Sequence, residues 1–433
     1  MTDWVAESEP GPEGSHVPHG ILTFLRSGYS HGYPTFLARG SGAFVWDASG
    51  RRWLDWVQGK GAVTLGHACP EVDAAVARRG GQGVLLGACP AEYEELAGVL
   101  ARWLPGVEQA LFVKNGSDAI HAALRLARVF TGRDLVVSAG YHGWDDRLLP
   151  GAAPAPVPGA VLDFGYDLRE LERLLTEQGS RVAAVLVTPE PGFFGRELLE
   201  RARALAHTAS ALFIVDEVRA GLRLAPAGAH QHLGVSADLF TLSKGLANGY
   251  PLAAVLGRKD VLEASARTYV FGTYYAEASA LAAALASVRL YQERDVVGAI
   301  WRAGAELMGG LEQIFAEEGV RARCLGPAPI LQILFEDQAA EARFYAGAVR
   351  RGVLFFQDDG QCPSAAHTAE HVAETLAVCR EVAREIRAEL QGGRAERLET
   401  PSAELVARSA KRRMIRPEAV DAESFARRLG CAR

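Results

Sequence analysis

The chain has 433 residues, of which 49% are hydrophobic and 23% charged, and its formal net charge is −6. This length favours more than one structural unit, and the composition is typical of globular proteins. The negative net charge argues against binding to nucleic acid or to anionic lipid. Apolar runs such as ALAAALASV are too short to span a bilayer. We therefore expect neither a nucleic-acid partner nor a membrane partner.

The six cysteines are scattered without a CxxC pair, so the sequence predicts neither a zinc site nor a disulfide framework. The N-terminal stretch lacks the basic and apolar regions of a secretory signal, and we expect a cytoplasmic protein. Two histidine pairs, 230 with 232 and 367 with 371, are better explained as solvated or capping side chains than as metal ligands. Glu370 in particular is misplaced for an HExxH motif. We predict no metal site.

In chain order, the segment FVWDASGRRWLDWV at residues 44–57 predicts a hairpin with its turn at residues 47–50. From about residue 108, five short apolar runs alternate with segments of helical period; they include LFV at 111, LVVSA at 135, VAAVLV at 182, LFIV at 212 and DLFTL at 238. The segment at 118–130 predicts a one-sided helix. This alternation is typical of a mainly parallel sheet covered by helices.

After a helical run at 276–293 the pattern changes to helix, strand pair and helix over about residues 300–390. The segment beyond residue 392 is polar and basic, and we expect it to be peripheral and to end in a short helix, DAESFARRLG. We divide the chain into a segment 1–65 that contributes to a small domain, a large domain at 66–292, the rest of the small domain at 293–391, and a tail at 392–433.

Ligands of open parallel sheets bind beyond the carboxyl ends of the strands, so the residues after each apolar run are the informative ones. The first run is followed by KNGSD. Gly116 permits a tight turn, Ser117 offers a hydroxyl, and the following helix presents free amides at the positive end of its dipole. The turn is suited to a phosphate site, although by itself it is better explained as a simple helix cap.

The other strand ends carry an aromatic ring, acids and an amine. The second run is followed by Tyr141 and His142, and a core or surface tyrosine is the alternative there. The fourth run is followed by Asp216 and Glu217, one of which could simply cap a helix; a buried carboxylate needs a partner. The fifth run is followed by Lys244. A phosphate cradle, a stacking ring, a buried acid and an amine are together what pyridoxal 5′-phosphate requires.

The same motifs resemble those of the class III aminotransferases of fold-type I, and most closely the branch that contains glutamate-1-semialdehyde aminomutase. The resemblance covers roughly residues 17–390 and rests on KNGSDAIHAALRLAR, GYHGWDD, IVDEVRAGLR, DLFTLSKGLANGYPLAAVLGR and FGTYYAEASALAAA, which occur in the family's order and spacing. It implies an α/β fold with a large domain built on a mainly parallel seven-stranded sheet and a small α+β domain. It also implies pyridoxal phosphate as cofactor and a homodimer with shared active sites.

The resemblance makes Lys244 the Schiff-base lysine and Asp216 the acid that keeps the pyridine nitrogen protonated. Further cofactor contacts that it implies are Gly116 and Ser117 at the phosphate, Tyr141 and Val218 on the two ring faces, His142, Glu190 near the ring hydroxyl, and Gly272 and Thr273 reaching the phosphate from the partner subunit. The substrate candidates are Arg26, with Arg39 as a rival, Trp144 and Glu277.

Three departures from the aminomutase pattern bear on the reaction. Trp144 stands in place of a histidine, the loop at 149–162 is short and proline-rich, and residues 274–277 replace a turn of small residues. These features favour transfer from an amino-acid donor such as glutamate to a hydroxylated or otherwise polar ketone in biosynthesis. Two alternatives stay open: an intramolecular aminomutase, and a pyridoxal-phosphate-binding protein without catalysis.

Overall fold

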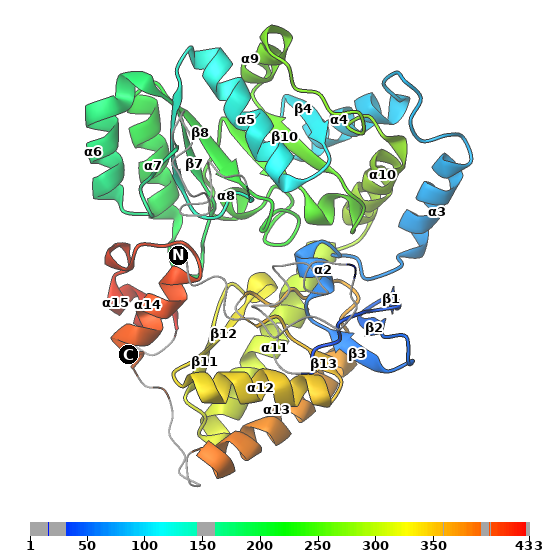
Figure 1. Cartoon of the computed structure of the whole chain (residues 1–433), viewed down its shortest axis with the longest axis vertical. Helices are drawn as coiled ribbons and strands as arrows, with labels where there is room; N and C mark the ends of the chain where they lie inside the picture. The colour runs from blue at the N-terminus through cyan, green and yellow to red at the C-terminus, as the bar shows by residue number, and fades with distance from the viewer. Residues whose placement is uncertain are drawn as a thin grey trace.

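The computed structural model describes residues 16, 32–144, 161–357, 359–390, 398 and 400–429. Figure 1 shows two units, one built on a large sheet and one built on long helices and a small sheet, with the C-terminal segment beside both. Within the described residues, no helix has the length and apolar character needed to cross a membrane. Arg26 and most of the loop at 149–162 lie outside the described residues.

The large sheet has seven strands in the order β4-β10-β9-β8-β7-β5-β6. The bounds are β4 Gln109–Val113, β5 Leu135–Ala139, β6 Val161–Asp163, β7 Val182–Val187, β8 Leu212–Asp216, β9 Leu239–Leu242 and β10 Ala253–Gly257. Strands β5 to β9 pair in parallel, whereas β10 is antiparallel to both of its neighbours. The predicted mainly parallel, seven-stranded sheet is confirmed, and five of its strands are the predicted apolar runs.

Strands β6 and β10 were not among the predicted runs. Strand β6 has only three residues, which is too short for a periodic pattern to emerge. Strand β10 is AAVLG, and alanine and glycine are poor strand formers whose pairing here depends on the two neighbouring strands.

Helices cover both faces of the large sheet, which explains why its strands are continuously apolar. Successive residues of β7 alternate between two cores: Val185 and Val187 belong to one core, and Ala184 and Leu186 to the other. The second core lies under α5 (Gly116–Thr131) and α9 (Lys259–Leu262). The first core is closed by α3 (Pro70–Gly80), α4 (Ala91–Trp103), α6 (Leu168–Gln178), α7 (Arg196–Thr208) and α10 (Ala278–Glu293).

The smaller unit contains a four-stranded sheet in the order β1-β2-β3-β13. Its strands are β1 (Arg39–Ser41), β2 (Phe44–Trp46), β3 (Arg52–Asp55) and β13 (Val353–Leu354). Strands β2 and β3 form the predicted hairpin, with Phe44 paired to Leu54. Strand β13 pairs in parallel with β3, so residues near the start of the chain share a sheet with residues 353–354. The division of the chain into domains stays a prediction.

Three helices and a hairpin complete the smaller unit: α11 (Val296–Glu318), α12 (Gln338–Arg350), α13 (Ala369–Leu390), β11 (Ala322–Leu325) and β12 (Gln332–Phe335). The predicted order of helix, strand pair and helix is present, with α12 and β13 in addition. Short helical segments elsewhere are α2 (Gln58–Gly61) and α8 (Ala229–His232), with 3₁₀ turns at Gly179–Arg181, Lys244–Ala247, Glu263–Arg267, Ala328–Ile330 and Pro417–Ala419.

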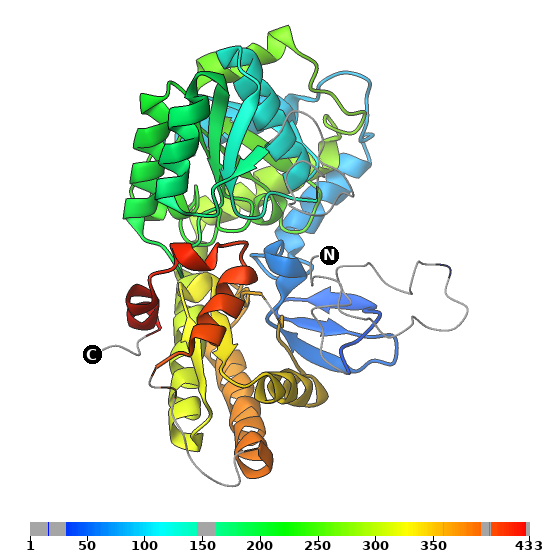
Figure 2. The same ribbon diagram turned by 60° about the vertical axis from the view of Figure 1, so that its left-hand side comes forward.

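The C-terminal tail is not peripheral as expected. Its helices α14 (Ala403–Lys411) and α15 (Ala422–Arg428) lie between the two units, and both Figure 1 and Figure 2 show the red segment there. Leu405, Ile415 and Phe425 of the tail are buried in the same core as the large sheet. The polar composition of the tail hid these widely spaced apolar positions, although the short final helix was predicted.

Candidate active site

Asp216 is the last residue of β8 and is only 4% exposed. Its Oδ1 accepts hydrogen bonds from the backbone amide of Val218 and from the Thr241 hydroxyl, each at 3.1 Å. Its Oδ2 lies 3.1 Å from His142 Nδ1. Thr241 is also the register partner of Asp216 on the neighbouring strand β9. Asp216 is thus a buried carboxylate whose orientation is held from two strands and one loop.

Lys244 follows β9 and begins a 3₁₀ turn with φ of 49°, in the left-handed region that non-glycine residues seldom adopt. Such backbone strain is often found at functional sites. Burial lowers the pKa of the Lys244 amine, an effect that Arg219 and Arg223 reinforce and that Asp359 and Cys362 oppose. At a given pH, a larger fraction of the Lys244 amine is therefore neutral than on a surface lysine, and the neutral form is the nucleophile.

A second lysine lies in the same electrostatic environment. Burial lowers the pKa of Lys60 to about 8, with the Lys244 charge adding to the effect and the Asp359 charge opposing it. The Lys60 ammonium also lies 5.5 Å from the ring centre of Phe356. Lys60 was not among the predicted site residues, and nothing in its local sequence, VQGKG, suggests a role.

The predicted phosphate turn begins α5 and is also a capped helix start, because Asn115 Oδ1 accepts the amide of Asp118 at 2.9 Å. The helix cap is thus present, and the phosphate site stays a prediction. A Cβ on Gly116 would lie 2.9 Å from Val218 Cγ1, and a Cβ on Gly143 would lie 2.2 Å from Ser117 Oγ. Glycine at 116 and 143 is thus required for the turn to pack against the loops that follow β8 and β5.

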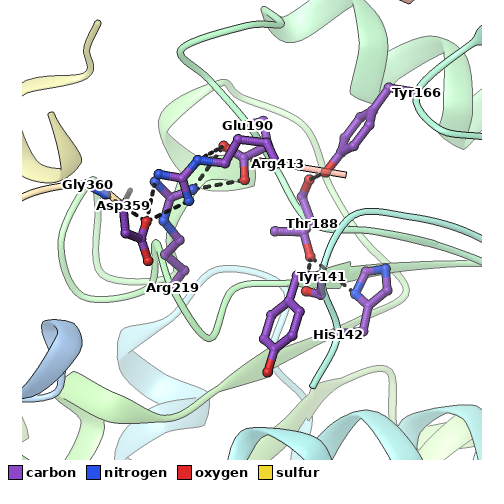
Figure 3. Close-up of polar contacts among 9 residues, drawn as sticks. All are labelled: Tyr141, His142, Tyr166, Thr188, Glu190, Arg219, Asp359, Gly360 and Arg413. Atoms are coloured by element: carbon purple, nitrogen blue, oxygen red, sulfur yellow. Dashed lines mark hydrogen bonds and ion pairs between the residues drawn. The ribbon is translucent and has the colours of Figure 1, made fainter. Parts of the chain in front are cut away.

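Tyr141 and His142 follow β5, and Figure 3 shows them beside Thr188. The His142 ring is buried, and its Nδ1 lies 3.1 Å from Thr188 Oγ1 as well as from Asp216. Since a carboxylate only accepts hydrogen bonds, we assign the proton to Nδ1. The Tyr141 side chain is 53% exposed, and partial burial together with the Asp216 charge raises its pKa. Tyr141 thus has an open face close to Asp216.

Glu190 lies in a group of four charged side chains that we call the charged cluster: Glu190, Arg219, Asp359 and Arg413 (Figure 3). Arg219 Nη1 donates to both carboxylate oxygens of Glu190 at 2.9 Å, and its Nη2 lies 3.8 Å from Asp359 Oδ1. Arg413 Nη1 lies 2.6 Å from the same Asp359 oxygen. Within the described residues, Glu190 is therefore engaged with an arginine side chain.

The predicted substrate contacts differ in exposure and in their partners. Trp144 is 76% exposed, and Arg39 is exposed with its guanidinium 3.8 Å from the ring centre of Trp46. Glu277 caps α10, accepting the Ser279 amide at 2.7 Å, and pairs with Lys114 at 3.0 Å. The Glu277 carboxylate is thus already engaged, and its role as a substrate contact stays a prediction.

Gly272 and Thr273 lie in an exposed loop before α10. This loop carries large apolar side chains that face solvent, with Tyr269 70%, Phe271 64% and Tyr274 65% exposed. Thr273 was expected to act in a partner subunit rather than in its own, and its exposure is compatible with that expectation.

Glu217, the second acid after β8, has a structural place. Its side chain is fully buried and accepts the amides of Ala229 and His230 at 2.8 and 2.7 Å, at the start of α8. Its Oε1 also lies 2.9 Å from His230 Nδ1. One of the two acids was expected to cap a helix, and it is Glu217. The part of the chain that the structure describes contains no cluster of three side chains suited to a metal ion.

Several residues of the site were missed from the sequence: Thr188, Thr241, Arg219, Asp359 and Arg413. Thr188 and Thr241 could have been found, since each lies at the end of a predicted strand, and Arg219 stands in the quoted segment DEVRAG. No local signal marks Asp359 or Arg413, because the tertiary fold brings them in from distant segments.

The sequence profile of the family Aminotransferase class-III matches residues 27–364. The chain belongs to the class III aminotransferases. It is 37% identical over 343 residues to 2′-deamino-2′-hydroxyneamine transaminase of Streptomyces kanamyceticus, covering 78% of this chain and 87% of that protein. It is 35% identical over 365 residues to glutamate-1-semialdehyde 2,1-aminomutase of Roseiflexus castenholzii, covering 78% of this chain and 84% of that protein.

Among solved structures, the fold is similar to that of the FumI protein of Sphingopyxis sp. MTA144 in its PLP internal aldimine form. The TM-score is 0.81 at 28% identity, covering 88% of this chain and 96% of that one. The protein is thus an enzyme, a pyridoxal-phosphate-dependent aminotransferase of fold-type I. The alternative of a binding protein without catalysis finds no support among these relatives.

The residues present fit this cofactor. Gly116 and Ser117 form the first turn of α5, whose free amides and Ser117 hydroxyl are donors at the positive end of the helix dipole. Asp216 offers a buried carboxylate that contacts a histidine ring, a hydroxyl and a backbone amide. Lys244 offers an amine of lowered pKa at the end of the neighbouring strand. A phosphate, a protonated ring nitrogen and an aldehyde are the groups that these three features suit.

Proposed function

We propose that this aminotransferase moves an amino group from an amino-acid donor such as glutamate to a hydroxylated or otherwise polar ketone in biosynthesis. The observation that carries the proposal is the polarity around Lys244. Asp359, Cys362, Arg219 and Arg223 all act electrostatically on its amine, and Lys60 lies in the same environment. Such surroundings favour substrates that carry charges and hydroxyls over purely apolar ones.

The relative from S. kanamyceticus supports the same substrate class, since its name specifies a hydroxylated neamine derivative. The aminomutase relatives keep the intramolecular reaction as a second candidate. The departures at Trp144 and at residues 274–277 favour the first candidate.

The site residues divide the work as follows. Pyridoxal phosphate, when bound, supplies an aldehyde for the amine and a ring that accepts electrons. The Lys244 amine would hold that aldehyde, and as a free amine it would accept the proton from the donor's α-carbon. The Asp216 carboxylate holds a proton on the ring nitrogen, and His142 and Thr241 fix its orientation. Gly116 and Ser117 bind the phosphate, and Tyr141 and Val218 flank the ring.

The test of reaction type uses the amino-loaded enzyme, prepared by incubation with glutamate and removal of the keto acid. Glutamate-1-semialdehyde is then supplied alone. An aminotransferase of the proposed kind forms little 5-aminolevulinate under these conditions, whereas it does convert polar keto substrates in proportion to glutamate consumed. Efficient formation of 5-aminolevulinate without any second substrate would establish the aminomutase instead.

We also propose a homodimer in the cytoplasm. The loop at 269–274 and the segment at 84–86 both expose apolar side chains, and the Ala278 amide at the start of α10, shortly after that loop, donates to the Val84 carbonyl at 2.8 Å. A second copy of the chain is the proposed occupant, with Thr273 reaching its partner's site. The five described cysteines are free, as is usual in a reducing compartment.

Co-expression tests the shared site directly. Subunits carrying Lys244→Ala and subunits carrying Thr273→Asp should each be inactive or nearly so. In a mixed dimer, one of the two sites then carries both changes and the other carries neither, so activity should return on mixing. Failure to recover activity in a proven mixed dimer would show that Thr273 acts within its own subunit.

A further inference from the structure

The C-terminal tail delivers one side chain into the charged cluster. Arg413 lies just after α14, where its amide donates to the Ala410 carbonyl at 2.9 Å, and only 7% of its side chain is exposed. Its Nη1 lies 2.6 Å from Asp359 Oδ1, and its Nε lies 4.0 Å from Glu190 Oε2. The family profile matches residues 27–364 only, so Arg413 stands outside the matched part of the chain.

The tail backbone on both sides of Arg413 is fastened to different units of the molecule. Arg412 donates to Glu341 on α12 at 2.9 Å, in the smaller unit. Arg416 donates to the Asp163 carbonyl beside β6 at 2.6 Å, in the larger unit, and the Phe425 ring stacks on Phe193 with centres 5.2 Å apart. These contacts fix where the Arg413 side chain enters the cluster.

Asp359 is the member of the cluster that acts on Lys244. Burial acts to raise the pKa of Asp359, but the charges of Arg413 and Arg219 more than offset it and hold the carboxyl ionised. The Asp359 charge in turn is the largest influence that opposes the lowered pKa of Lys244. The Asp359 side chain retains 33% exposure.

The segment that carries Asp359 is packed against Arg219 and the smaller unit. A Cβ on Gly360 would lie 2.6 Å from the Ile330 carbonyl oxygen and 3.2 Å from Arg219 Nη2, and the Gln361 amide donates to the Leu331 carbonyl at 2.7 Å. The backbone is therefore held, and the Asp359 carboxylate is oriented by the Gly360 amide at 2.6 Å together with its two arginine partners.

We propose that Arg413 is a positioning residue: it holds the Asp359 carboxylate in the charged cluster and so prevents that carboxylate from pairing with the Lys244 amine. Without Arg413, the Asp359 carboxylate keeps the 3.8 Å contact to Arg219 and the hydrogen bond from the Gly360 amide at 2.6 Å, but it loses its shortest ion pair and is held less firmly against the attraction of the lysine. A carboxylate paired with the amine would favour its protonated form, and the protonated form cannot attack an aldehyde. The inference rests on the proposed role of Lys244.

The experiment is a pH titration of the holoenzyme, followed through the absorbance of the bound cofactor, which reports protonation at the nitrogen that Lys244 contributes. Arg413→Gln should raise the midpoint by about one pH unit, the lower end of the shift that an opposite charge at close range produces. Arg413→Lys should restore much of the original value. Asp359→Asn should lower the midpoint, because the charge that raises it is gone.

The matched control is Arg412→Gln, which removes an adjacent tail arginine whose carboxylate partner, Glu341, lies outside the cluster. Its midpoint should equal that of the wild type. An equal rise in Arg412→Gln would mean that loosening of the tail, rather than the position of Asp359, is responsible, and the inference would fail. An unchanged midpoint in a well-folded Arg413→Gln protein would overturn it as well.

Two further measurements separate the possible failures. If Arg413→Gln does not fold, the double variant Asp359→Asn/Arg413→Met removes both charges of the pair. Its midpoint should match that of Asp359→Asn alone, and a different midpoint would show that Arg413 acts on Lys244 without Asp359. Borohydride reduction with peptide mapping checks Lys244 itself: cofactor on another lysine would refute the proposed role of Lys244 rather than the role of Arg413.

The charged groups that face Lys244 come from several elements. The variants of this titration leave all of these groups unchanged except Asp359 and its partner Arg413. Arg219 and Arg223 come from the segment after β8, Cys362 from the same segment as Asp359, and Lys60 from α2. Asp359 is the nearest charged partner of Arg413, so we expect the change on removal of Arg413 to pass through Asp359, and the double variant tests this route.

Discussion

The edge of the large sheet and the charged cluster are built in different ways. At the sheet edge, Asp216, Thr241 and Lys244 each lie at or just after a strand end, and parallel pairing of β8 with β9 brings them together. In the charged cluster, the four side chains come from positions 190, 219, 359 and 413, in both units and the tail. A local chain pattern can encode the first arrangement, whereas only the complete tertiary structure creates the second.

We expect the largest effect of a single substitution at the sheet edge. Lys244→Ala should reduce turnover by about 10⁴-fold or more, since it removes both the attachment point and a positioned acid–base group. The fold should persist, because the residues around it pack through the backbone of the 3₁₀ turn. Turnover and thermal unfolding are measured together, and substantial turnover in this variant would refute the assignment.

Asp216→Asn should have the next largest effect. A neutral amide cannot keep the ring nitrogen protonated, and we expect kcat to fall by roughly 10²- to 10³-fold, as for the loss of one preorganised electrostatic contact. The cofactor should stay bound, as its absorbance will show. The neighbouring Glu217→Gln is the control: it should lower stability, through the amides at the start of α8, and leave kcat nearly unchanged.

In the charged cluster, Glu190→Gln tests whether the charges depend on one another. Arg219 would lose its bidentate partner while remaining mostly buried, and we expect unfolding free energy to fall by about 2 kcal/mol, below the cost for a fully buried pair. Adding Arg219→Met should restore a good part of this loss. Denaturant titrations of the two single variants and the double variant measure the coupling, and strict additivity would count against a cluster.

The smallest effect concerns Lys60. Its amine should lose its proton with a midpoint near pH 8, since burial lowers its pKa to about that value. Below this pH the side chain is cationic and above it neutral, so its labelling by an amine-reactive reagent should increase through pH 8. Asp359→Asn should move the midpoint lower, because the carboxylate charge raises it. A midpoint near the ordinary lysine value of about 10.4 would contradict this prediction.

The two regions also show what could be predicted from the sequence. The hairpin at 44–57, five strands of the large sheet and the turn that begins α5 all follow from patterns within a few residues, and the structure has them. Strand β10 was missed because alanine and glycine are poor strand formers, so that this strand depends on pairing with its two neighbouring strands. The burial of the tail was missed because its apolar residues are far apart in the sequence. The engaged state of Glu277 and Glu190 depends on partners that are remote in sequence, Lys114 and Arg219.

Because the chain is synthesised from its N-terminus, Arg413 is added later than Lys244 and Asp359. Lys244 leaves the peptidyl-transferase centre 169 residues before Arg413 and Asp359 does so 54 residues before it, as the numbering of the chain shows. At about 5–20 residues per second, the intervals are roughly 8–34 s and roughly 3–11 s. Throughout these intervals the nascent chain carries the reactive lysine, and later also Asp359, without the arginine that restrains it. A chain whose translation ends between Asp359 and Arg413 would therefore have a complete sheet edge and an incomplete charged cluster.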